Sequence, residues 1–172
     1  MPLKIKIFMW FLYRKEILTK DNLIKRRWAG CKKCVFCDAD ETVDHLFVSC
    51  DFARKIWRLV HFTFSITPPM NVTNLFGTWL NGVDKDTKAS IRVGVCDFLW
   101  AIWNCRNDVI FNNLEAGHFL QVVHRATHWI HMWSMLLPAA QRGRLDAVCS
   151  RLMAVVRAIF STGGWLHARR LL

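Results

Sequence analysis

The sequence predicts a mainly α protein, in which a small module of short helices around a cysteine-rich segment is followed by a helical, bundle-like extension. Apolar residues make up 53% of the 172 residues, which is enough to form a buried core. They recur three and four positions apart along most of the chain, as on one face of a helix. Strict alternation of apolar and polar residues, the pattern of a half-buried strand, is weak throughout.

The first part of the chain is expected to form short helices. Residues 2–17 are typical of a buried helix, with a proline suited to its first turn. Thr19 is a candidate N-cap for a short basic helix over residues 20–28. Beyond the cysteine-rich segment, residues 50–64 again carry apolar side chains at helical spacings.

A boundary is expected at residues 65–73, "SITPPMNVT", which contain a proline pair and small polar residues. We therefore predict one domain over residues 1–64, a linker over residues 65–73, and a helical region over residues 74–172.

Four helices are expected in the last region. The first is short and ends at Gly82; the second begins at Asp84 or Asp86, and its middle is apolar almost all round, which indicates burial on more than one side. The last two are predicted over residues 118–136 and 139–160, with Pro138 between them and "STGGW" ending the second.

The charge balance favours a polyanionic partner. Lys and Arg number 24 against 13 Asp and Glu, a net charge of +11, and nucleic acid is the commonest polyanion that such proteins bind. The alternative is a basic surface that only aids solubility. No secretory signal is visible, and no apolar stretch reaches the ~18–20 residues of a membrane span. Seven cysteines, an odd number, favour a reducing compartment, so we expect an intracellular protein, nuclear or cytoplasmic.

Four residues have the spacing of a metal site, Cys34-x2-Cys37-x7-His45-x4-Cys50. A Cys-x2-Cys knuckle lets both sulfur atoms reach one ion, and thiolate with imidazole ligands suits tetrahedral Zn²⁺. Four protein ligands leave no open position, so one structural zinc is predicted. Cys31 offers a second knuckle with Cys34, which we favour less, and the alternative without metal is reduced cysteines beside a core histidine.

The spacing of the last two ligands sets a geometric condition. Residues five apart in an ideal α-helix differ by about 140° in direction. His45 and Cys50 can therefore face one ion only if the helix ends or distorts between them, and we expect it to end near Ser49.

Several stretches, "PLKIKIFMWFL", "LTKDNLIKRRW" and "KCVFCDADETVDHLFVSCDFARKIW", together resemble the zinc-binding domain that follows the reverse transcriptase in plant non-LTR (LINE-type) retrotransposons. The family's metal ligands fall on Cys34, Cys37, His45 and Cys50, whereas Cys31 falls where the family shows no fixed ligand. "NLFGTWLNG", "RVGVCDFLWAIWNCRNDVIFN" and "RATHWIHMW" resemble the helical tail of grass members. The resemblance implies a zinc-stabilised module that helps to position template RNA or target DNA.

A basic segment lies directly before the knuckle and is the candidate surface for single-stranded RNA or DNA of low sequence specificity. Its residues are Lys20, Lys25, Arg26, Arg27, Trp28, Lys32 and Lys33. The cations would hold phosphates while the tryptophan stacks on a base. The alternative is a solvated face with Trp28 packed against the knuckle.

No catalytic residues are predicted, and we expect a protein that is not an enzyme. A polymerase needs paired aspartates for two metal ions, and the only tyrosine, Tyr13, is followed by Arg-Lys-Glu rather than by such a pair. The alternative function is a protein-interaction or vestigial module that self-associates through exposed apolar helices.

Smaller clusters are interpreted as structural. The tryptophans of the later helices, Trp100, Trp103, Trp129 and Trp133, are expected in the core rather than as a stacking platform. The histidines at 124, 128 and 131 have no cysteine or carboxylate near them in sequence and are not predicted to bind metal. The cysteines at 96, 105 and 149 are expected to be packing residues.

Overall fold

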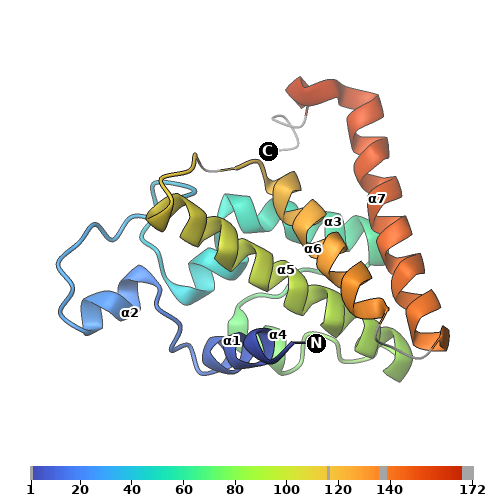
Figure 1. Ribbon diagram of the computed structural model, residues 1–172, viewed down its shortest axis with the longest axis horizontal. Helices are drawn as coiled ribbons and strands as arrows, with labels where there is room; N and C mark the ends of the chain where they lie inside the picture. The colour runs from blue at the N-terminus through green and yellow to red at the C-terminus, as the bar shows by residue number, and fades with distance from the viewer. Residues whose placement is uncertain (1, 116, 136–138, 168–172) are drawn as a thin grey trace.

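The computed structural model describes residues 2–115, 117–135 and 139–167 (Figure 1). Within this part of the chain the fold is mainly α, as predicted, and the β-type pairing is a single isolated bridge between Lys33 and Asp40. The helices are α1 (Leu3–Tyr13), α2 (Lys20–Lys25), η1 (His45–Ser49), α3 (Asp51–Phe64), α4 (Val72–Phe76), α5 (Lys85–Phe111), α6 (Phe119–Ser134) and α7 (Ala139–His167).

Helix α5 is the centre of the molecule. It contacts α1, α6 and α7, and α3 packs on α6 and α7 from another side (Figure 1). Asp84, one of the two predicted starts, caps α5 by accepting a hydrogen bond from the Thr87 N–H at 2.9 Å. The apolar middle of α5 is buried on several sides, as expected: Phe98 and Leu99 are both in the core although they point in different directions.

The first helix ends earlier than predicted, at Tyr13 instead of residue 17. Lys15 adopts a left-handed conformation with φ of 54°, and the N–H groups of Lys15 and Glu16 return to the carbonyls of Leu12 and Phe11, at 2.9 Å each. These two hydrogen bonds satisfy the last carbonyl groups and end the helix without a glycine.

Two other predicted boundaries were wrong. The short helix expected up to Gly82 is α4, which begins inside the predicted linker and ends at Phe76; turns follow it, and Gly82 adopts a left-handed φ of 86°. Helix α7 does not end at "STGGW" but continues to His167. A helix-interior glycine costs only about 1 kcal/mol relative to alanine, which lowers helix stability without forcing an end. The predicted break at Pro138 lies outside the described residues.

The core is shared by the two parts of the chain that the sequence analysis separates. Phe8 of α1 and Phe47 of η1 lie 6.3 Å and 6.4 Å from Trp103 of α5, measured between ring centroids. Buried side chains from residues 8–60 and 72–156 form one cluster. The division into domains at residues 65–73 remains a prediction, although the buried surface is continuous across it.

Candidate metal centre and the buried ion pair beside it

The four predicted ligands lie together, and their ligand atoms are all within 4.8 Å of one another. The Sγ atom of Cys50 is 4.0 Å from that of Cys34 and 3.8 Å from that of Cys37. The Nε2 atom of His45 is 3.1 Å from the Sγ of Cys37. They are the only such group of three or more side chains among the described residues.

A tight loop brings the first two cysteines to this point. The Cys34 N–H donates to the Ala39 carbonyl at 2.8 Å, next to the bridge between Lys33 and Asp40, so the chain turns back within six residues. The Phe36 N–H points at the Cys34 sulfur at 3.4 Å. Backbone N–H groups directed at a sulfur stabilise its thiolate form, which is the form that binds metal.

The last two ligands meet because the helix distorts. The Cys50 N–H donates to the His45 carbonyl at 2.7 Å, a hydrogen bond that spans five residues instead of four. Such a π turn is wider than an α turn, so residues five apart lie one above the other, and single π turns often mark functional sites. The expected end near Ser49 is confirmed, since α3 starts afresh at Asp51.

The dimensions of the cluster fit a tetrahedral zinc ion. With Zn–S bonds of about 2.3 Å, two sulfur ligands are about 3.8 Å apart, close to the observed 3.8 and 4.0 Å. The shorter Cys37–His45 distance needs an opening of a few tenths of an ångström. Three soft sulfur donors with one imidazole suit Zn²⁺, and with four ligands the site is structural.

Negative charge in the cluster is concentrated on one thiol. The hydrogen bond from the Cys50 thiol lowers the pKa of Cys34 to about 5, and the same contact raises the pKa of Cys50. Burial raises the pKa of Cys37. Zn²⁺ binds thiolates, so it must displace protons from Cys37 and Cys50, and its binding weakens as the pH falls.

The remaining cysteines and histidines take no part in the cluster. Cys31 is exposed and lies outside the ligand group, so the knuckle in this fold consists of Cys34 and Cys37. The cysteines at 96, 105 and 149 are buried or half-buried in the helices α5 and α7, as expected. The histidines at 124, 128 and 131 are exposed on α6 and join no ligand group within the described residues.

The comparison with known families agrees with this geometry. Residues 1–57 match the family model described as zinc-binding in reverse transcriptase. The match covers the first third of the chain and supports a reverse-transcriptase-associated zinc-binding domain there. No curated protein and no solved structure matches the chain. None of the described helices is long and apolar enough to cross a membrane.

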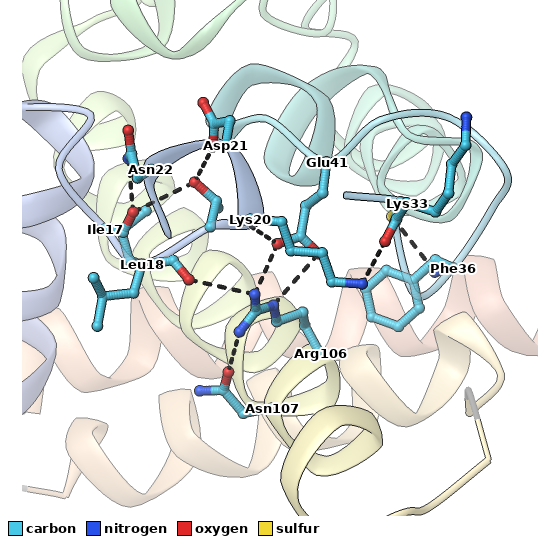
Figure 2. Close-up of polar contacts among 12 residues, drawn as sticks. Ile17, Leu18, Lys20, Asp21, Asn22, Lys33, Phe36, Glu41, Arg106 and Asn107 are labelled. Carbon is cyan, nitrogen blue, oxygen red and sulfur yellow. Dashed lines mark hydrogen bonds and ion pairs between the residues drawn. The ribbon is translucent and has the colours of Figure 1, made fainter. Parts of the chain in front are cut away.

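An ion pair joins the zinc-binding domain to α5, outside the matched residues. Figure 2 shows the Arg106 guanidinium directed at the Glu41 carboxylate; the two nitrogen–oxygen distances are 2.8 and 3.4 Å, and both side chains are almost completely buried. Arg106 also donates to the carbonyl of Leu18 at 3.3 Å and to Asn107 at 3.0 Å, and it lies over the Trp103 ring.

Glu41 is hydrogen-bonded to both α2 and the knuckle loop. Its carboxylate accepts from the Lys20 N–H at 2.9 Å (Figure 2). Its carbonyl accepts from the Asp21 N–H at 3.2 Å, and its own N–H donates to the Lys32 carbonyl at 2.8 Å. It also directly precedes Thr42, whose hydroxyl accepts from the His45 N–H at 3.1 Å. Glu41 thus ties α2, the knuckle loop and the histidine turn together.

The role of Glu41 was not predicted from the sequence. A signal for its partner was present: Arg106 is four and seven residues after Ile102 and Leu99, so it shares their buried face and needs a buried counter-charge. The sequence offers no means to choose Glu41, 65 residues away, among the acidic residues.

Several cations of the predicted basic segment contact neighbouring protein groups, so the segment is only partly available to a ligand. Lys20 donates to the Lys33 carbonyl, Lys25 to Asn22 at 2.8 Å, and the ammonium groups of Lys32 and Lys33 lie 3.4 and 3.1 Å from the Asp40 carboxylate. Arg26 and Arg27 are exposed. The Trp28 ring is 41% exposed and lies so close to Gly30 that a side chain there would collide with it.

The four tryptophans, which were expected in the core, are only half-buried. Trp100 and Trp103 pack against the core with one side and line a surface groove with the other. Trp129 and Trp133 are stacked, with ring centroids 5.6 Å apart. The indole nitrogens of Trp100 and Trp133 are buried without a hydrogen-bond partner.

Proposed function

We propose that the protein is a non-catalytic, intracellular module of a plant LINE-type element, which binds single-stranded RNA or DNA with low sequence specificity. The observation that carries this proposal is the attachment of the basic segment to the zinc framework. Lys20, Lys32 and Lys33 lie on backbone that Glu41 and the knuckle loop hold in place. A fixed array of cations beside an exposed tryptophan suits phosphates and one stacked base.

The contribution of each cation differs. Lys32 and Lys33 share one carboxylate, Asp40, so together they supply a net charge of about one to a phosphate. Arg26 and Arg27 are exposed at the end of α2 and are the strongest candidates for phosphate contacts. The contacts of the basic segment suit phosphates rather than particular base edges, so affinity should depend on salt more than on sequence.

A salt titration of the zinc-loaded chain tests this proposal. Each phosphate contact on a single strand contributes about −0.7 to the slope of log K against log salt. Removing both arginines, Arg26→Ala with Arg27→Ala, should therefore reduce the slope by about 1.4 and weaken binding to all sequences alike. Arg142→Ala on α7, which is also an exposed arginine, is the control. An affinity that is indifferent to salt would exclude the proposal.

A second candidate, a self-associating interaction module, is supported by an exposed apolar stripe on α1. Leu3, Ile7 and Trp10 are 72%, 48% and 53% exposed, at a helical spacing that makes one apolar stripe. The exposed cations Lys4 and Lys6 beside this stripe would repel those of a second copy. Sedimentation equilibrium separates the candidates, because obligate dimers without affinity for single strands would favour this one.

A further inference from the structure

A groove of about 370 Å³ lies between α1 and α5, and the segment after α1 also lines it. This volume is at the lower end of the 300–1,000 Å³ typical of ligand pockets. Its aromatic lining consists of Phe8, Phe11, Trp100 and Trp103. Phe11 is 39% exposed, so part of its ring is accessible from the groove side of α1.

The charges at the rim are predominantly positive. Lys4 lines one part of the groove, with its ammonium group 5.9 Å from the Trp100 ring, and Arg26 lines another. The one acidic lining residue, Glu16, is held by the Arg14 guanidinium at 2.9 Å, so its charge is compensated. An aromatic slot between cations complements a flat ring carried on an anionic backbone.

We propose that this groove takes one base of the single strand whose phosphates lie on the basic segment. The inference rests on the proposed function and adds a second stacking site to it. Arg26 belongs both to the basic segment and to the groove lining, so a strand that follows these cations passes the groove opening. A second copy of this chain fits less well, because Lys4 and Arg26 would face their own equivalents.

Two oligonucleotides, one with bases and one without, separate the contribution of the bases to binding from that of the phosphates. The probes are a fluorescent oligo-dT strand and the same strand with abasic sites at every position, both titrated with zinc-loaded full chain by anisotropy at low salt. Stacking of one base is worth about five- to 150-fold in affinity. We expect the base-bearing strand to bind tighter by at least that lower factor, and Phe11→Ala to reduce the ratio.

Matched variants locate the effect. Phe62→Ala removes an exposed phenylalanine of α3 outside the groove and should leave the ratio unchanged. Ile7→Glu, which places a carboxylate in the groove from a half-exposed position, should reduce the ratio like Phe11→Ala. Circular dichroism with zinc verifies that each variant is folded; if Phe11→Ala unfolds, Ile7→Glu decides.

Three outcomes overturn the inference, and they are distinguishable from failure of the proposed function. Equal affinity for both strands, or a ratio that falls only in Trp28→Ala, leaves phosphate binding intact but excludes a base in the groove. A dimer that Phe11→Ala dissociates shows that a second copy fills the groove. Absence of binding to either strand rejects the proposed function itself, and the groove inference with it.

Discussion

Replacement of Arg106 by methionine is expected to destabilise the protein and to loosen the zinc site. Methionine keeps much of the aliphatic volume but removes the guanidinium, so the Glu41 carboxylate loses its counter-charge while it stays buried. Glu41 would retain the hydrogen bond from the Lys20 N–H. Removing one partner of a buried pair typically costs 3–5 kcal/mol, because a buried charge is left uncompensated.

The free energy of unfolding measures this cost. Urea unfolding in the presence of zinc should give a loss of about 3–5 kcal/mol for Arg106→Met, whereas Arg92→Met, at an exposed position of the same helix, should remain within about 0.5 kcal/mol. Glu41→Gln alone should also be costly. The double variant should cost clearly less than the sum, since both charges are then absent.

Zinc affinity provides the second measurement. Glu41 joins the knuckle loop and the histidine turn, so its displacement should lower affinity for Zn²⁺ by about 10–100-fold in a chelator competition, the range seen for residues that orient metal ligands. An Arg106→Met variant that loses less than about 1 kcal/mol of stability and binds zinc as tightly as the wild type would contradict this role of the ion pair.

Three further outcomes are expected. Removal of zinc by a chelator should unfold the zinc-binding domain, since such sites contribute on the order of 10 kcal/mol to the free energy of folding. Mass spectrometry under native conditions should show loss of the metal in Cys37→Ser and its retention in Cys31→Ser. Burial without a partner raises the pKa of Asp97 to about 7, so the folded state holds this proton more tightly than the unfolded state. Its contribution to stability is therefore full below about pH 4 and is lost as the pH rises through 7, by up to about 4 kcal/mol; Asp97→Asn should flatten that decline in urea unfolding at pH 5 and 8. Ser65, left-handed at the end of α3 with φ of 56°, should accept glycine with a gain of up to about 1 kcal/mol in thermal unfolding; a loss would contradict that account.

The zinc ligands could be predicted because their information is local. Cys34 and Cys37 form a knuckle by spacing alone, and the five-residue interval from His45 to Cys50 required a break or distortion that the structure provides as a π turn. Caps such as Asp84 are local too. The observed helix ends at Tyr13 and His167 were not predicted. In the first case a lysine adopts the left-handed conformation that ends the helix, and in the second the glycines do not end it.

Contacts between distant residues could not be predicted. A buried position for Arg106 follows from helical spacing, but the choice of Glu41 depends on how α5 packs against the loop. The same is true of Asp44, which binds Lys15 at 2.7 Å and also accepts from the Val72 N–H at 2.8 Å. Each of these pairs spans at least 28 residues, so its partner is decided by tertiary packing.

The zinc ion and the buried ion pair have different structural roles: the ion closes a loop, and the ion pair sets the orientation of that loop. The ion closes the chain between Cys34 and Cys50, but a zinc-closed loop could still adopt several orientations on the helical core. Arg106 removes that freedom, because it binds the loop at Glu41 and the end of the preceding segment at the Leu18 carbonyl. A buried pair rarely adds much net stability over an apolar one, so we expect the contribution of this pair to be in orientation. The basic segment begins at Lys20, between these two anchor points, and its position relative to the aromatic groove is therefore set by α5, from outside the residues that match the zinc-binding family.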